Sequence, residues 1–169
     1  MAPRHHGPTM ATADTCPQCP APTVDVAREE LRRAGAAGDA AHRDRYLRDA
    51  AEKLWLAVCQ ETDRFIMVNW PSEAGTYVPG EAEAHRSRRD ILYRHNRQDL
   101  EQGLESVSAG IHGDIFYGGA MLHGQRMTRD DILLRFHSAH RFLLKLGGEL
   151  NDPSFDIPEL YGQDATRLG

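Results

Sequence analysis

One helical repeat of apolar residues, spanning residues 39–68, constrains the fold of this chain more than any other feature. The repeat consists of Leu47, Ala51, Leu54, Val58 and Phe65, and it is widened by Trp55, Cys59 and Ile66. These positions recur at intervals of three or four residues or their sum, which places them on one buried face of an α-helix. Asp39 precedes the repeat as a helix cap. Because so long an apolar stripe must be covered, we expect the rest of the chain to pack around this helix.

The rest of the patterned sequence is also helical and has no strand alternation of useful length. We expect a short leading helix from residue 23 or 25 to about 34, helices over 81–104 and 105–117, and a closing helix from Thr128 to Gly147-Gly148. Thr128 and Asp131 have the spacing of a capping box. The predicted inner residues of the closing helix are Ile132, Leu133, Phe136, Leu143, Leu144 and Leu146. The sequence therefore predicts an all-α protein, an antiparallel four-helix bundle with a short leading helix and irregular termini.

A chain of 169 residues is long enough for one domain. Residues 1–22 are proline-rich and unpatterned, which predicts a disordered N-terminal tail, and Met10 is an alternative start. Residues 23–150 form the predicted helical domain, and residues 151–169 form an irregular acidic C-terminal tail. The longest apolar run has six residues, from Leu54 to Cys59, whereas a membrane span needs about 20. Since the N-terminus also lacks an apolar export signal, we expect a cytoplasmic protein.

The charge of the chain is mildly acidic but unevenly distributed. The formal charge of −5 comes from 20 basic and 25 acidic residues, which argues against a strongly basic nucleic-acid coat protein. Five arginines nevertheless lie between residues 85 and 97, where the only acidic residue is Asp90. They are Arg86, Arg88, Arg89, Arg94 and Arg97. Because arginine contacts phosphate bidentately, this segment is a candidate RNA-binding face; the alternative is a solvated helix face.

Candidate metal ligands begin with Cys16 and Cys19, which have the spacing of half a zinc site. The sequence contains no second pair of this kind, so a free dithiol in the tail is the alternative. The nine histidines raise the further possibility of a metal site inside the bundle. His137 with His140, or Glu81 with His85, are spaced to share one face of a helix.

The glycine spacing of residues 113–118 imitates a phosphate-binding loop. The lysine that must follow the second glycine is replaced by Gly119, so no charge is present there to hold phosphates. We therefore expect no nucleotide hydrolysis and no cofactor.

A resemblance to a known family comes from three segments. The segment Tyr46–Val58, YLRDAAEKLWLAV, resembles the signature helix of the PaREP1 family of the HEPN-like helical superfamily. His85-Arg86 resembles the opening of that family's next helix. Residues 111–117, IHGDIFY, are similar to its Leu-His-x-Asn-Phe-Tyr-like segment, and residues 128–132 resemble the start of its closing helix. The resemblance covers about residues 40–148 and implies a compact antiparallel helix bundle, often paired into a homodimer.

The resemblance also implies candidate catalytic residues, because many HEPN proteins are metal-independent ribonucleases. Their position in the family's pattern assigns His112, Asp114 and Tyr117. The superfamily's Arg-x4–6-His formula fits Arg89 with His95, and also Arg135 with His140. In that motif the histidine handles the proton of the 2′-hydroxyl and the arginine steadies the phosphate.

A regular helix alone would not bring Arg89 and His95 together. Arg89 and His95 are six residues apart, which is about 120° of rotation on a regular helix. A helix end or a partner subunit must therefore bring the two side chains together.

Three functions remain open at this point. The first is a homodimeric binding or regulatory module linked to RNA or to a toxin–antitoxin type system, with RNA or a small nucleotidyltransferase as its partner. The second is a metal-independent ribonuclease of HEPN toxin type, and the third is a His-rich metal-binding helix bundle.

Overall fold

The computed structural model describes residues 19–78 and 83–150. In this part of the chain there are five α-helices, one π-helix and one two-stranded hairpin, so the predicted all-α class is confirmed. The α-helices are α1 (Ala21–Ala36), α2 (Ala40–Asn69), α3 (Ala84–Arg94), α4 (Gln98–Val107) and α5 (Arg129–Glu149). The π-helix η2 (Ser108–Tyr117) continues α4, and β1 (Met121–Leu122) pairs antiparallel with β2 (Gln125–Arg126).

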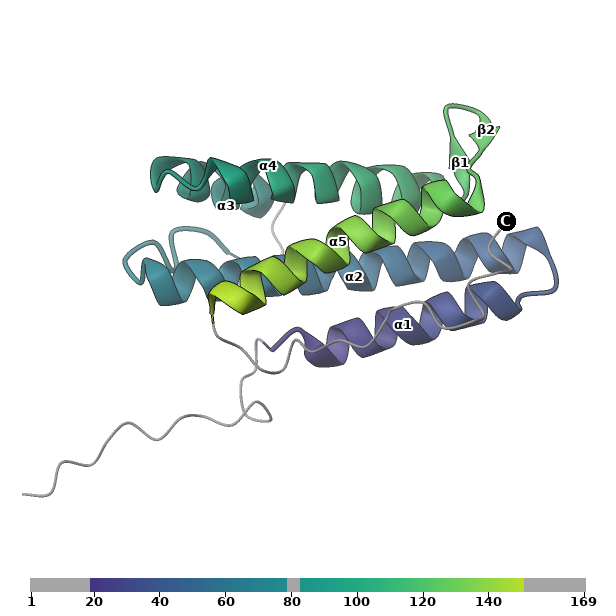
Figure 1. Cartoon of the computed structure of the whole chain (residues 1–169), viewed down its shortest axis with the longest axis horizontal. Helices are drawn as coiled ribbons and strands as arrows, with labels where there is room; N and C mark the ends of the chain where they lie inside the picture. Colours follow the sequence, from purple (N-terminus) through teal and green to yellow (C-terminus); the bar gives the residue numbers. More distant parts are fainter. Residues whose placement is uncertain (1–18, 79–82, 151–169) are drawn as a thin grey trace, which may run out of the picture.

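Helix α2 is the element on which the others assemble (Figure 1). Helix α1 runs antiparallel beside it after a short turn. Helix α4 and η2 form one continuous rod, also antiparallel to α2, and α5 lies across both α2 and this rod. Helix α3 packs against α4 near one end of the molecule, and the β1–β2 hairpin projects at the other.

The apolar stripe predicted for α2 forms the core. Leu47, Ala51, Leu54 and Val58 are fully buried, and Phe65 is nearly so. Asp39 caps the helix as predicted, because its carboxylate accepts a hydrogen bond of 3.0 Å from the backbone N–H of His42. Three side chains on predicted inner faces differ: Trp55 and Leu133 are only partly buried, and Leu144 is exposed.

The single helix predicted over residues 81–104 is wrong, because the chain turns between α3 and α4. Asn96 has φ 57°, a left-handed conformation that asparagine adopts more readily than most residues. The backbone N–H of Arg97 then bonds to the carbonyl of Leu92 at 2.8 Å. The two shorter helices therefore fold back on each other, which places a face of α3 against α4.

The helix predicted over residues 105–117 is also different in kind. Helix α4 already begins at Gln98, and from Ser108 the chain continues as the π-helix η2. The closing helix agrees better with its prediction. Thr128 and Asp131 form the predicted capping box, and α5 continues to Glu149, so that Gly147 and Gly148 lie in its last turn.

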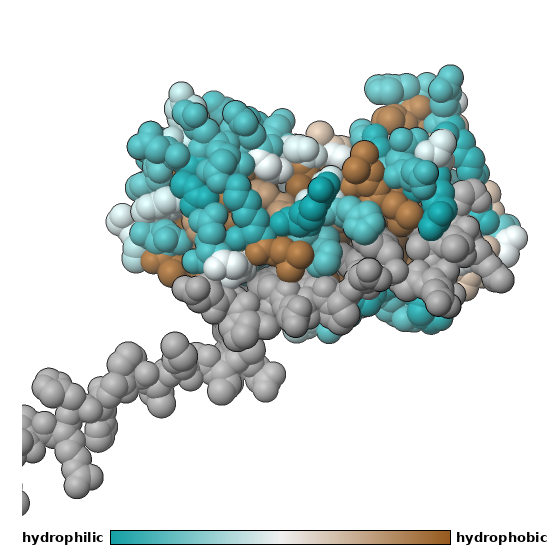
Figure 2. Space-filling view, in the orientation of Figure 1, coloured by the Kyte–Doolittle hydropathy of each residue, from teal (hydrophilic) through white to brown (hydrophobic). Residues whose placement is uncertain are grey.

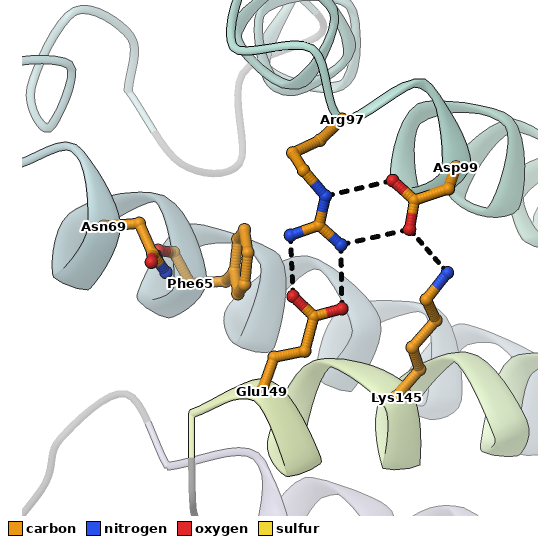
Figure 3. Close-up of polar contacts among 6 residues, drawn as sticks. All are labelled: Phe65, Asn69, Arg97, Asp99, Lys145 and Glu149. Carbon is orange, nitrogen blue, oxygen red and sulfur yellow. Dashed lines mark hydrogen bonds and ion pairs between the residues drawn. The ribbon is translucent and has the colours of Figure 1, made fainter.

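An ion-pair network holds the end of α5 against the turn between α3 and α4 (Figure 3). Arg97 donates to Glu149 at 2.6 and 2.7 Å and to Asp99 at 3.0 Å, and Lys145 donates to Asp99 at 2.7 Å. These bonds raise the pKa of Arg97, and together they hold the pKa of Asp99 well below its usual range. The guanidinium of Arg97 also lies 5.4 Å from the ring centre of Phe65.

Among the described residues, no helix is both long enough and apolar enough to cross a lipid bilayer. Figure 2 shows hydrophilic side chains gathered over the end of the molecule where α3 meets α4, and apolar residues nearer the middle of the same face.

Candidate functional site

The strongest candidate site is a group of aromatic and histidine side chains beside α2, which we call the Trp55 cluster. Its members are Trp55, His85, His112, Phe116 and Tyr117. Helix α2 supplies the indole, α3 supplies His85, and η2 supplies the other three. The cluster therefore lies where three elements distant in sequence meet, and it combines rings with two titratable groups.

The π-helix brings His112 and Tyr117 together. In a π-helix the hydrogen bonds run between residues five apart, so side chains at i and i+5 lie close to each other. In the α-helix predicted from the sequence, the same two residues would be about 140° apart. In the structure their ring centres are 5.1 Å apart, in an edge-to-face arrangement. π-Helices are rare, and most are single-turn bulges inside α-helices that often lie at functional sites.

His112 is held between two aromatic rings. Its imidazole stacks on Trp55 at 5.5 Å between ring centres and on Phe116 at 5.3 Å, nearly parallel to the second ring. Burial, with the nearby His85, lowers the pKa of His112 below its usual value of 6.5. The imidazole is therefore neutral at neutral pH and fixed in orientation, a condition in which it can accept a proton.

His85 is oriented by a carboxylate on the neighbouring helix. Its Nε2 lies 3.3 Å from a carboxylate oxygen of Glu105, and its ring meets Trp55 edge to face at 5.3 Å. Burial lowers the pKa of His85, while Glu105 opposes this effect. The Nδ1 atom of His85 is buried and has no hydrogen-bond partner among the described residues.

Arg89 lies one helical turn from His85 and is held by the same face of α4. It donates to Glu101 at 2.7 Å and forms an ion pair with Glu105 at 2.7 Å. Glu105 is thus shared between Arg89 and His85. This arrangement fixes both side chains, but it also neutralises most of the charge that Arg89 could offer to a phosphate.

Of the catalytic residues predicted by position, only two are brought together. His112 and Tyr117 belong to the Trp55 cluster. Asp114 instead pairs with Arg135 of α5, with oxygen–nitrogen distances of 2.8 and 2.9 Å. This pair fastens η2 to α5, and it occupies the carboxylate that would otherwise be available to orient His112.

The two Arg–His pairs predicted from the ribonuclease formula have separate partners. His95 stacks on Trp70 at 4.1 Å between ring centres and lies 3.1 Å from Glu73, whereas Arg89 faces α4. Arg135 pairs with Asp114. His140 is 8% exposed, and its Nε2 has no hydrogen-bond partner among the described residues.

The arginines predicted to bind RNA are mostly engaged with carboxylates. Arg88 is 4% exposed and donates to both oxygens of Asp63, at 2.6 and 2.8 Å. Its position in the interior removes it from the predicted RNA-binding face, because the pair ties α3 to α2. Arg94 donates to Glu73 at 3.0 Å, and Arg97 is the centre of the network in Figure 3. Arg86 is the exception, being exposed with one carboxylate at 3.9 Å.

The predicted metal ligands do not form a site in the described part of the chain. Cys16 and Glu81 lie outside the described residues, and Cys19 is a free thiol. Among residues 19–78 and 83–150, no three histidine, cysteine or carboxylate side chains gather closely enough to hold a metal ion. Burial raises the pKa of the Cys59 thiol to about 12, so the free thiol is protonated at neutral pH.

Sequence reasoning missed the role of Trp55 and Glu105. Trp55 is at the edge of the apolar stripe of α2, where its large ring is only partly covered. Tryptophan is seldom fully buried, and this property was the available signal. The contact between Glu105 and His85 joins residues 20 positions apart and depends on the turn at Asn96.

The chain matches no protein-family model, no curated protein and no solved structure.

Proposed function

We propose that this protein is a small helical RNA-binding module that holds unpaired nucleotides at the Trp55 cluster. The observation that carries the proposal is the row of partly exposed rings, which ends at Tyr117 with 65% of its surface exposed. Proteins hold unpaired RNA bases by stacking them on aromatic side chains, and each stacked base contributes about 1–3 kcal/mol. Phe116 and His112 both contact the Tyr117 ring edge to face, at 5.0 and 5.1 Å between ring centres, so the exposed ring is packed against its neighbours before a base arrives.

The charges near the platform fit this mode of binding. Arg89 is already paired with Glu101 and Glu105, so phosphate contacts in this region fall mainly to Arg86. Stacking, rather than charge, therefore supplies most of the affinity in this proposal.

Fluorescence polarisation with a labelled single-stranded oligoribonucleotide tests the proposal. We expect Tyr117→Ala to weaken binding at least about fivefold, because it removes the exposed stacking ring. Val26→Ala is the control, since Val26 is also an exposed large side chain and lies on α1, outside the α2 and α5 surface proposed for the dimer. Equal affinity of wild type and Tyr117→Ala, or equal weakening in both variants, would contradict the proposed site.

We further propose that the fold is the HEPN-like four-helix bundle, with α3 as an additional helix, and that the protein is a homodimer. Exposed apolar side chains such as Leu56, Val68 and Leu134 support a second copy as partner, because apolar surface of this kind is often covered by association. A small nucleotidyltransferase as a further partner stays a prediction.

A metal-independent ribonuclease is the second candidate function. The observation that favours it is the pair of imidazoles on Trp55, of which His112 is neutral and His85 is oriented by Glu105. The neutral His112 can take the proton of a 2′-hydroxyl, and His85, in the fraction that carries a second proton beside Glu105, can give one to the leaving oxygen. Incubating the protein with labelled RNA in EDTA tests this candidate: cleavage that His112→Ala abolishes would support it, and intact RNA would refute it.

A further inference from the structure

A cavity of about 420 Å³ opens beside the Trp55 cluster and shares His85 with it. Its volume is within the range of about 300–1,000 Å³ that is typical of ligand sites. The residues that line it are His85, Arg86, Arg89, Asp90, Tyr93 and Glu101. A ligand seated on the Trp55 cluster would therefore adjoin this cavity at His85.

Three of the lining side chains are available to a ligand. Tyr93 is 61% exposed, and in the described part of the chain its ring contacts no other ring. Arg86 is 87% exposed. Asp90 has Arg86 as its ion-pair partner, at 3.9 Å and on an exposed part of α3, so its carboxylate oxygens are free to accept hydrogen bonds. By contrast, Arg89 and Glu101 are already joined by a hydrogen bond.

These three groups have complementary chemistry. An exposed tyrosine ring is a surface on which a planar base stacks, and an exposed arginine contacts a phosphate. A carboxylate accepts two parallel hydrogen bonds, and therefore suits a base edge that presents two adjacent N–H donors. Guanine has such an edge in its N1–H and N2 amino groups. Adenine, cytosine and uracil each place an acceptor next to their donor, so a carboxylate meets them with one bond and one repulsion.

We infer that this cavity is a guanine subsite of the RNA site. In this subsite the base stacks on Tyr93, its N1–H and N2–H groups donate to Asp90, and Arg86 contacts the adjoining phosphate. The neighbouring nucleotide occupies the Trp55 cluster. The inference rests on the proposed function, which it extends from single-stranded RNA in general to RNA that carries an unpaired guanine.

Competition between oligoribonucleotides that differ at one position tests the subsite. Three single-stranded RNAs carry guanosine, inosine or adenosine at the same central position, and polarisation gives the affinity of each. Inosine is the sharp probe, because it keeps the N1–H of guanine and lacks the N2 amino group. We expect the guanosine RNA to bind at least about fivefold more tightly than the adenosine RNA, with inosine between them.

The variant Asp90→Asn tests whether the carboxylate of Asp90 recognises the guanine base. It replaces one acceptor oxygen with a donor, so we expect it to weaken binding of the guanosine RNA at least about fivefold. Binding of the adenosine RNA should not weaken and should tighten if adenine enters the subsite, because an amide meets the adjacent donor and acceptor of adenine together. Asp49→Asn is the matched control, because Asp49 also has an arginine four residues away on an exposed helix face, Arg45 at 3.9 Å. We expect Asp49→Asn to change neither affinity.

The possible failures are distinguishable. Equal binding of the guanosine and adenosine RNAs by the wild-type protein would overturn the guanine subsite and leave RNA binding standing. The same outcome follows if Asp90→Asn weakens both RNAs equally, or if Asp49→Asn reproduces its effect. If none of the three RNAs binds, both the subsite and the proposed function are refuted.

Discussion

Arg88 and Asp63 form a buried ion pair that joins α3 to α2, and the hydroxyl of Tyr77 donates to the same carboxylate. Removing one partner of such a pair leaves a buried charge uncompensated, which typically costs about 3–5 kcal/mol. We therefore expect Arg88→Ala to lower the free energy of unfolding by about that amount, as measured by urea denaturation.

The control for this prediction is Arg86→Ala, two residues away. Arg86 is exposed and its single ion pair is long, so its removal should change the free energy of unfolding by no more than about 0.5 kcal/mol. Equal losses in the two variants would show that Arg88 is not an interior anchor.

The buried position of His140 leads us to expect that the free energy of unfolding depends on pH. Burial lowers the pKa of His140 below its usual value of 6.5. His137 and Arg28 lower it further, because they repel the positive charge that a protonated His140 would carry. Between the lowered pKa and 6.5 the unfolded chain binds more protons than the native protein, so stability rises with pH in that range. The contribution is complete above pH 6.5 and is lost as the pH falls below it.

Replacing His140 by leucine should remove this contribution. We expect the free energy of unfolding of the wild type to fall relative to His140→Leu when the pH is lowered from 7.5 to 5.5, as measured by urea denaturation at each pH. A difference between the two proteins that stays constant over this range would refute the prediction.

At the scale of elements, the packing of α4 against α5 depends on the absence of a side chain at Gly103. A Cβ atom at this position would lie 2.8 Å from the ring of Phe142, which is nearly buried. Overpacking of this kind costs about 1–3 kcal/mol, so we expect Gly103→Ala to lower the melting temperature despite the better helix propensity of alanine.

Gly148 supplies the matched control, because it also lies in a helix but a Cβ atom there meets nothing within 4 Å. Gly148→Ala should therefore leave the melting temperature unchanged or raise it. If the two substitutions have the same effect, the close contact between α4 and α5 is not a constraint.

The elements also show what the sequence could reveal. Helix α2 was predicted within a residue of its ends, because Asp39 marks the start and a long apolar stripe continues to Phe65. The turn between α3 and α4 depends on one left-handed residue, Asn96, inside an otherwise helical pattern. The π-helix was not predictable, since its hydrogen bonds shift by one residue without any change in residue type. Consequently the sequence identified His112 and Tyr117 as candidates but not the Trp55 cluster to which both belong.

At the scale of the whole molecule, the distribution of charge predicts how RNA binding responds to salt. Arg88 is buried, and Arg89, Arg94 and Arg97 are held by carboxylates, so of the five arginines between residues 85 and 97 Arg86 is left to contact phosphates at the proposed site. We expect the logarithm of the binding constant to fall with the logarithm of the salt concentration with a slope of only about −1. A slope of about −3 or steeper would mean that phosphate contacts, rather than stacking, carry the affinity.

Association is the second property of the whole molecule. The exposed apolar side chains of α2 and α5, among them Leu56, Val68 and Leu134, lead us to expect a homodimer. Light scattering at micromolar concentration should therefore give about twice the chain mass of 18.9 kDa. A monomeric mass would contradict this expectation and would require the RNA site to be complete within one chain.

The central claim, that RNA stacks on the Trp55 cluster, is tested most directly by the fluorescence of the two tryptophans. The chain has only Trp55 and Trp70, so Trp70→Phe leaves the indole of the cluster as the single reporter, and Trp55→Phe leaves the indole that stacks on His95. Titration of each variant with a single-stranded oligoribonucleotide should perturb the emission of Trp55 saturably and leave that of Trp70 unchanged. An unchanged Trp55 signal, or an equal change in both variants, would contradict the account.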